Sequence, residues 1–162
     1  IIGSRANFHM IGHLQTNKVK YIIDKVSLIH SLDRLSLAEE LQKRACKLGI
    51  IVNALIQVNI AEEDSKFGLK INEVVPFLNK VMEFDKIKIK GLMTIAPYAE
   101  DPEDVRWVFR DLRKLKEHIA NMNLKNVEMN ILSMGMTNDY KIAIEEGANM
   151  IRIGTGLFGK RN

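Results

Sequence analysis

An almost unbroken apolar run at residues 50–60 constrains the fold more than any other stretch of the sequence. A strand that is apolar along its whole length is buried on both faces, as in a parallel sheet covered by helices. Further strands are predicted at residues 8–12, 26–31, 87–95, 127–132 and 150–153, and helical patterns separate them. Strands that alternate with helices predict an α/β fold with a parallel sheet wrapped by helices.

Capping signals predict where several of these helices begin and end. A Ser-x-x-Glu capping box at 36–39 and the following Gly49 bound one of them. The Asp-Pro-Glu segment at 101–103 opens the helix that has the clearest apolar stripe. Either Thr137 or Asn138 is expected to cap the next helix, which ends at Gly147.

The number of predicted strands is smaller than a closed barrel of this type requires. A TIM-type (β/α)8 barrel has eight strands and typically about 250 residues. This sequence has 162 residues, and it begins with Ile1 rather than methionine. We therefore expect residues 1–162 to form one barrel domain that lacks roughly its first two βα units, as a piece of a longer product.

Composition argues against several classes of function. No apolar run is long enough to span a membrane and no signal-peptide pattern is present, so we expect a cytoplasmic protein that binds no membrane. The net charge of +4 is spread along the chain without interleaved aromatic residues, which disfavours a nucleic-acid partner. The single Cys46 excludes an internal disulfide, and no pair of histidines has metal-ligand spacing, so no metal is predicted.

The segments that follow the last two predicted strands have the pattern of a phosphate site. In parallel βα barrels, phosphates often bind after strands seven and eight, where glycines and backbone N–H groups gather. Here the first loop is predicted at 133–137 and the second begins at 154–156, each with a glycine and a hydroxyl. Arg152 stays on the last strand, from which it can face a ring whose phosphate lies in the loop. The alternative is that Ser133 and Thr137 only cap a helix.

Seven short motifs carry a resemblance to a known family. In chain order they are Phe-His-x-Ile-Gly-x-Leu-Gln-x-Asn-Lys at 8–18, His-Ser-x-Asp-Arg at 30–34, Gln-Val-Asn at 57–59, Ser-Lys-x-Gly at 65–68, Gly-Leu-Met at 91–93, Leu-Ser-Met-Gly-Met at 132–136, and Arg-Ile-Gly-Thr…Phe-Gly at 152–159. Together they resemble the pyridoxal phosphate homeostasis proteins, which are single-domain barrels similar to the N-terminal domain of alanine racemase. The resemblance is collinear and runs from Phe8 to Arg161.

The resemblance implies a cofactor, pyridoxal 5′-phosphate, and a set of residues that hold it. The candidate cofactor-binding residues are Ser133, Arg152, Gly154, Thr155, Thr137 and His9. By motif, Ser133 and the 154–155 turn should hold the phosphate, and Arg152 should face the pyridine nitrogen. A fixed cation there opposes protonation of that nitrogen. His9 either points into the mouth of the barrel or is a hydrogen-bonded core histidine.

The family's lysine that forms an aldimine with the cofactor lies at the end of the first strand, in a Ser-Lys type motif. No segment of this sequence matches that motif in that place, so the lysine is expected upstream of Ile1. Lys66 follows a serine, but it aligns with the loop after the family's fifth strand, where pairing with nearby acids is the expected role. No catalytic residue is therefore assigned within this chain.

The function implied by the resemblance is that of a protein that holds pyridoxal phosphate and passes it on, without strong turnover of its own. The implied partners are the cofactor and the apo-enzymes that receive it, and we expect a monomer. One alternative is an amino-acid racemase of the same fold, which would need a second acid/base; none of Tyr21, Tyr98 and Tyr140 lies in a motif for that role. The other alternative is a barrel that binds a different phosphorylated small molecule.

Overall fold

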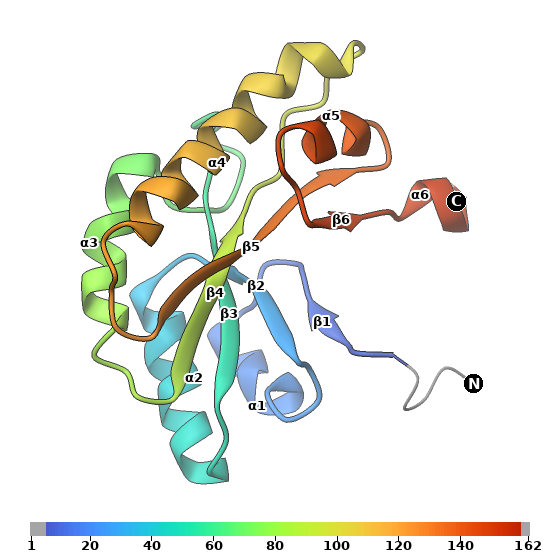
Figure 1. The fold of residues 1–162 in the computed structure, drawn as a ribbon. Coiled ribbons are helices and arrows are strands. Elements are labelled where there is room, and N and C mark those ends of the chain that lie inside the picture. Colours follow the sequence, from blue (N-terminus) through green and yellow to red (C-terminus); the bar gives the residue numbers. More distant parts are fainter. Residues whose placement is uncertain (1–5, 160–162) are drawn as a thin grey trace.

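The computed structural model describes residues 6–159, and within them six parallel strands form one sheet (Figure 1). The strands are β1 (His9–Met10), β2 (Leu28–Leu32), β3 (Val52–Gln57), β4 (Ile87–Met93), β5 (Val127–Met136) and β6 (Met150–Arg152). Their order in the sheet is their order in the chain, so each strand pairs with the next. The sheet curves into half of a barrel, with the main helices on its convex side. The predicted α/β class is confirmed.

The connections between the strands contain the helices that cover this convex face. They are η2 (Thr16–Lys18), α1 (Val19–Ile22), α2 (Leu35–Leu48), α3 (Ile71–Val81), η3 (Pro102–Val105), α4 (Arg106–Ala120) and α5 (Tyr140–Glu145), whereas α6 (Thr155–Phe158) follows the last strand, β6. Of these, α5 and α6 are short, with six and four residues. Among the described residues, no helix is both long and apolar enough to cross a membrane.

Two separate apolar clusters form because the strands alternate their side chains between the two faces of the sheet. The larger cluster lies between the sheet and the helices. The predicted stripe of the α4 region is buried in it, as expected: Val105, Val108, Phe109, Leu112, Leu115 and Ile119. The smaller cluster, Leu28, Leu55 and Met93, packs with the partly buried Ile131 and Met150. Along the strands, these residues alternate with residues of the larger cluster. They therefore lie on the concave face of the sheet, inside the half-barrel.

Strand β5 is longer than predicted, and residues 133–136 are strand rather than loop. Ser133 pairs with Met93 of β4 and with Met150 of β6, while Met136 pairs with Arg152. Pairing with β6 therefore carries the strand through Gly135, a glycine that the sequence suggests is a break. Gly135 has a φ of 90°, and a Cβ there would lie 2.6 Å from the Ala143 side chain.

Two of the predicted caps are wrong and two are confirmed. Helix α2 begins at Leu35 with no side-chain cap, so the capping box at 36–39 does not form, whereas Gly49 ends the helix with a left-handed φ of 67°. The Asp101 carboxylate accepts the Glu103 N–H at 2.9 Å, as predicted, although the first turn is a 3-10 helix.

The expected cap of the helix before Gly147 also fails. Helix α5 starts only at Tyr140, and its N-terminal flanking residue Asp139 makes no side-chain cap. The Asn138 amide instead donates to the Ala99 carbonyl at 3.0 Å, which ties this loop to the segment after β4. The Thr137 hydroxyl turns toward the loop after β6. Thr137 therefore does not cap the helix that follows it in the chain.

Candidate functional site

The loops after β5 and β6 meet at the carboxyl end of the sheet and border an open pocket of about 920 Å³. The pocket is lined by Tyr98, Met136, Thr137, Asn138, Gly154, Thr155, Phe158 and Gly159. The Thr137 hydroxyl accepts the Gly156 N–H at 3.2 Å and lies 3.2 Å from the Thr155 hydroxyl. The two loops predicted to form a phosphate site are thus in direct contact, with a hydroxyl from each at the pocket wall.

Glycine at position 156 allows this contact to be close. A Cβ placed there would lie 3.0 Å from Cγ2 of Thr137 and 3.2 Å from Cγ2 of Ile153. Because helices α5 and α6 are short, an anion in the pocket would be held by individual hydroxyl and backbone groups more than by a long helix dipole.

Arg152 lies at the end of β6, directly before this pocket, with only 8% of its surface exposed. Its Nη1 donates to the Ser133 hydroxyl at 2.8 Å and its Nη2 donates to the Thr94 carbonyl at 2.8 Å. Its Nε is buried and has no hydrogen-bond partner. Burial lowers the pKa of Arg152 to about 10, and the negative charge of Asp139 partly opposes that effect. Within residues 6–159 no carboxylate pairs with the guanidinium, which remains a buried cation with an unused donor.

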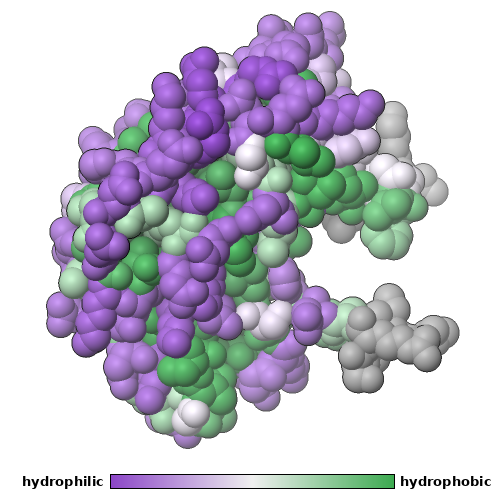
Figure 2. Space-filling view, viewed as in Figure 1, coloured by the Kyte–Doolittle hydropathy of each residue, from purple (hydrophilic) through white to green (hydrophobic). Residues whose placement is uncertain are grey.

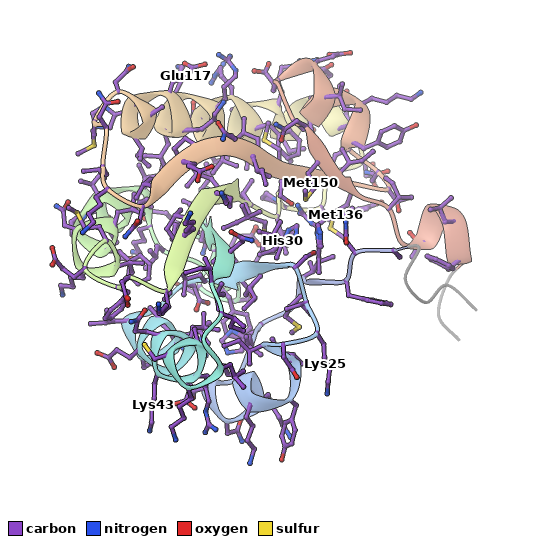
Figure 3. The ribbon with its side chains drawn as sticks, turned by 60° about the horizontal axis from the view of Figure 1, so that its bottom comes forward. Lys25, His30, Lys43, Glu117, Met136 and Met150 are labelled. Carbon is purple, nitrogen blue, oxygen red and sulfur yellow. The ribbon has the colours of Figure 1, made fainter. Side chains whose placement is uncertain are left out.

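Ser133 is fully buried on β5, and its hydroxyl joins Arg152 to His30 of β2. The His30 Nδ1 lies 3.0 Å from the Ser133 Oγ, and its Nε2 lies 3.1 Å from Nδ1 of His9 on β1. Figure 3 shows His30 inside the curve of the sheet, between β2 and β5. Burial first, and then the positive charges of His9 and Arg152, lower the pKa of His30 to about 4, so its ring is neutral at pH 7.

The predicted site residues therefore fall into two adjoining groups. Thr137, Gly154 and Thr155 line the pocket, whereas Ser133 and Arg152 bond to each other beneath it. His9 joins the second group through His30, but it is exposed at the edge strand, so the alternative of a core histidine is wrong. Figure 2 shows the half-barrel hollowed on the side where β1 and β6 lie in Figure 1.

His30 and Thr94 are site residues that are not among the six candidates from the sequence, although His30 lies in the 30–34 motif. The signal for His30 is a polar pair, His30-Ser31, inside a strand whose five residues are all buried. Thr94 directly follows β4. Its hydroxyl donates to the Val58 carbonyl at 2.7 Å, and its carbonyl accepts the hydrogen bond from Nη2 of Arg152. Every residue has a backbone carbonyl, so the sequence does not indicate that the carbonyl of Thr94 is the one that accepts from Arg152.

Lys66 takes the role expected of a loop lysine. Its Nζ donates to the Ala96 carbonyl at 3.2 Å and lies 3.2 Å from the Glu63 carboxylate. These contacts pin the loop after β3 to the segment after β4.

A family model, that of the alanine racemase N-terminal domain, matches residues 2–162. The pyridoxal phosphate homeostasis protein of Aquifex aeolicus is 51% identical over 154 residues, which are 95% of this chain and 67% of that protein. The chain belongs to the pyridoxal phosphate homeostasis branch of this family. The protein of the same name from Helicobacter pylori strain 26695 is 41% identical over 153 residues, 93% of this chain and 66% of that protein. The chain thus spans about two thirds of the length of these curated relatives.

Solved structures agree with this family assignment. PipY of Synechococcus elongatus with pyridoxal phosphate bound is 30% identical with a TM-score of 0.84, over 94% of this chain and 70% of PipY. The alanine racemase of Clostridium difficile is 16% identical with a TM-score of 0.79, over 98% of this chain and 41% of the enzyme. The second likeness shows the shared fold alone. The resemblance inferred from the motifs is confirmed.

Proposed function

We propose that this chain binds pyridoxal 5′-phosphate and serves in its homeostasis, holding the cofactor and passing it on without strong turnover of its own. The observation that carries the proposal is Arg152, a buried cation with an unused N–H donor, on the strand that leads into the pocket-lining residues Gly154 and Thr155. A buried charge without a carboxylate partner is costly unless an acceptor is supplied. The names of the relatives and the bound cofactor in PipY support pyridoxal phosphate as that acceptor.

The residues present fit the two ends of this cofactor. The hydroxyls of Thr137 and Thr155, with the turn at Gly154, would hold the phosphate at the pocket wall. Arg152 would face the pyridine nitrogen and keep it unprotonated, which makes the bound ring a weak electron sink. Because the Ser133 hydroxyl already contacts Arg152 and His30, we assign Ser133 to the ring end of the site rather than to the phosphate.

We also propose that residues 1–162 are one cofactor-binding domain and that two further βα units complete the barrel between β6 and β1. The two edge strands of the described sheet each pair on one side only, and an open edge of this kind is normally covered or paired. The lysine that binds the cofactor covalently belongs to those units in this proposal. It does not require Lys66, whose ammonium group already contacts Ala96 and Glu63.

The test is equilibrium dialysis of the chain against pyridoxal phosphate, with absorbance spectra of the retained cofactor. The Arg152→Gln variant should weaken retention by roughly tenfold or more, since it removes hydrogen bonds from a charged group, and it should change the absorbance spectrum. Arg110→Gln is the matched control, because Arg110 is exposed on α4 and, within residues 6–159, its one ion pair is with Asp111. Inorganic phosphate should compete with the cofactor. No retention by the wild-type chain, or equal retention by both variants, would contradict the proposal.

A further inference from the structure

A row of four side chains crosses the inside of the half-barrel from one edge strand to the other. His9 on β1 meets His30 on β2 at 3.1 Å, His30 meets Ser133 on β5 at 3.0 Å, and Ser133 meets Arg152 on β6 at 2.8 Å. Strands β2 and β5 are not neighbours in the sheet, so the contact between His30 and Ser133 spans the interior. The position of Arg152 is therefore connected to a side chain on the opposite wall.

The chemistry of the four groups gives this row a direction. A guanidinium can only donate, so the Ser133 oxygen accepts from Arg152. The buried Ser133 hydroxyl still has one proton to donate, and His30 Nδ1 is its other hydrogen-bond partner. If Nδ1 accepts that proton, the His30 ring carries its hydrogen on Nε2 and donates it to Nδ1 of His9. Each of the three contacts in the row then has one donor and one acceptor.

We propose that His30 is a positioning residue that holds Arg152, through the Ser133 hydroxyl, in place to face the ring of the bound cofactor; this rests on the function proposed above. Two contacts fix the guanidinium: Ser133 at Nη1 and the Thr94 carbonyl at Nη2. Without the Ser133 contact, the guanidinium can rotate about its remaining bond to the Thr94 carbonyl. The unpaired Nε–H of Arg152 then no longer points in a fixed direction.

The neutrality of His30 is part of this arrangement. A protonated ring would place a hydrogen on Nδ1 and donate to Ser133, which reverses the direction of the row. The groups that face His30 are His9, Ser133 and Arg152. The charge of Arg152, and that of His9 whenever its ring is protonated, oppose protonation of His30. Burial of His30 is the larger cause and acts in the same sense, and its pKa of about 4 keeps the ring neutral at pH 7 with one nitrogen free to accept.

Two substitutions of His30 separate positioning from a merely structural role. An asparagine amide reaches the place of Nδ1, so His30→Asn keeps a partner for Ser133. A glutamine amide reaches the place of Nε2, so His30→Gln keeps the contact with His9 and loses Ser133. His30→Gln and Ser133→Ala should weaken retention of pyridoxal phosphate by roughly tenfold, the value of about one hydrogen bond to a charged group. His30→Asn should stay within about threefold of wild type on the same scale.

Nitrogen-15 NMR supplies a readout that needs no cofactor. At pH 7 the wild-type His30 ring should carry its hydrogen on Nε2, and the Arg152 Nη–H signals should be resolved. These signals should remain resolved in His30→Asn and average by rotation in His30→Gln and Ser133→Ala. A hydrogen on Nδ1 of His30, or equal behaviour of His30→Asn and His30→Gln, would overturn the positioning role. Absence of cofactor retention by the wild-type chain, with these NMR differences intact, would instead overturn only the proposed function.

Discussion

The Thr137 hydroxyl, on the loop after β5, accepts the backbone N–H of Gly156 after β6 at 3.2 Å. This bond joins the two loops that border the pocket. It also holds the Thr137 methyl group so close to Gly156 that a Cβ on residue 156 would crowd it. Thr137 therefore has two roles: it fixes the relative position of the loops, and it presents a hydroxyl to an anion between them.

Thr137→Val should lower the affinity of the chain for inorganic phosphate and for pyridoxal phosphate by roughly tenfold, since it removes about one hydrogen bond to a charged oxygen and keeps the shape of the side chain. Thr137→Ser is the control, because it retains the hydroxyl. Titration calorimetry measures both. If the Thr137→Val variant binds phosphate as tightly as Thr137→Ser does, the Thr137 hydroxyl makes no contact with the anion.

Gly91 permits a close approach of β4 and β5. A Cβ at this position would lie 1.9 Å from the Ile131 carbonyl oxygen, and the residue has a φ of +154°. Gly91→Ala should therefore lower the free energy of unfolding by about 3 kcal/mol or more, because backbone must move to make room. Gly12→Ala is the matched control, since a Cβ there meets nothing within 4 Å. Urea denaturation compares them; similar losses in both would refute a steric role for Gly91.

Much of the fold could be predicted from the sequence because its determinants are local. The apolar run around Leu55 and the stripe through Phe109 indicate which faces are buried. Leu55 and Phe109 are both fully buried, although Ile51 near the start of the run is 45% exposed. The order of parallel strands then places the loops that contain Thr137 and Gly154 at the same end of the sheet, where they share a pocket.

The polar row beneath the pocket could not be predicted, because it depends on register between distant strands. His30 and Ser133 are 103 residues apart, and their contact requires that both side chains point inward at the same height. The length of β5 posed a similar problem. Gly135 looks like the end of a strand in sequence, and only pairing of Met136 with Arg152 shows that the strand continues.

Glu146 links α4 to the end of α5 by bridging two arginines, and its side chain is only 13% exposed. Burial would raise its pKa, but the bonds to Arg106 and Arg113 outweigh burial and lower it. Glu146→Gln should cost about 1 kcal/mol of unfolding free energy at low ionic strength, and less as salt is added. Glu117→Gln, which removes a 55% exposed partner of Arg113, should cost less than about 0.5 kcal/mol. Equal, salt-independent losses would contradict this ranking.

Acidification should destabilise the chain through His30. Its pKa is lowered from 6.5 to about 4 in the folded state, so between these values the unfolded chain binds more protons than the folded one. The stability contribution is complete above pH 6.5 and is lost as the pH falls toward 4. Its full size is roughly 3 kcal/mol, at about 1.4 kcal/mol for each pKa unit. Chemical denaturation at a series of pH values measures it.

Comparison with His30→Asn isolates this contribution, because the protonation of carboxylates at low pH affects both proteins alike. The variant should be less stable than wild type at pH 7 but should lose less stability on acidification, so the two curves converge toward pH 4. His118→Gln, which removes an exposed histidine from α4, should run parallel to wild type throughout. If the His30→Asn curve also stays parallel to wild type from pH 7 to pH 4, His30 is not held neutral by the fold, and the direction of the row from Arg152 to His9 loses its basis.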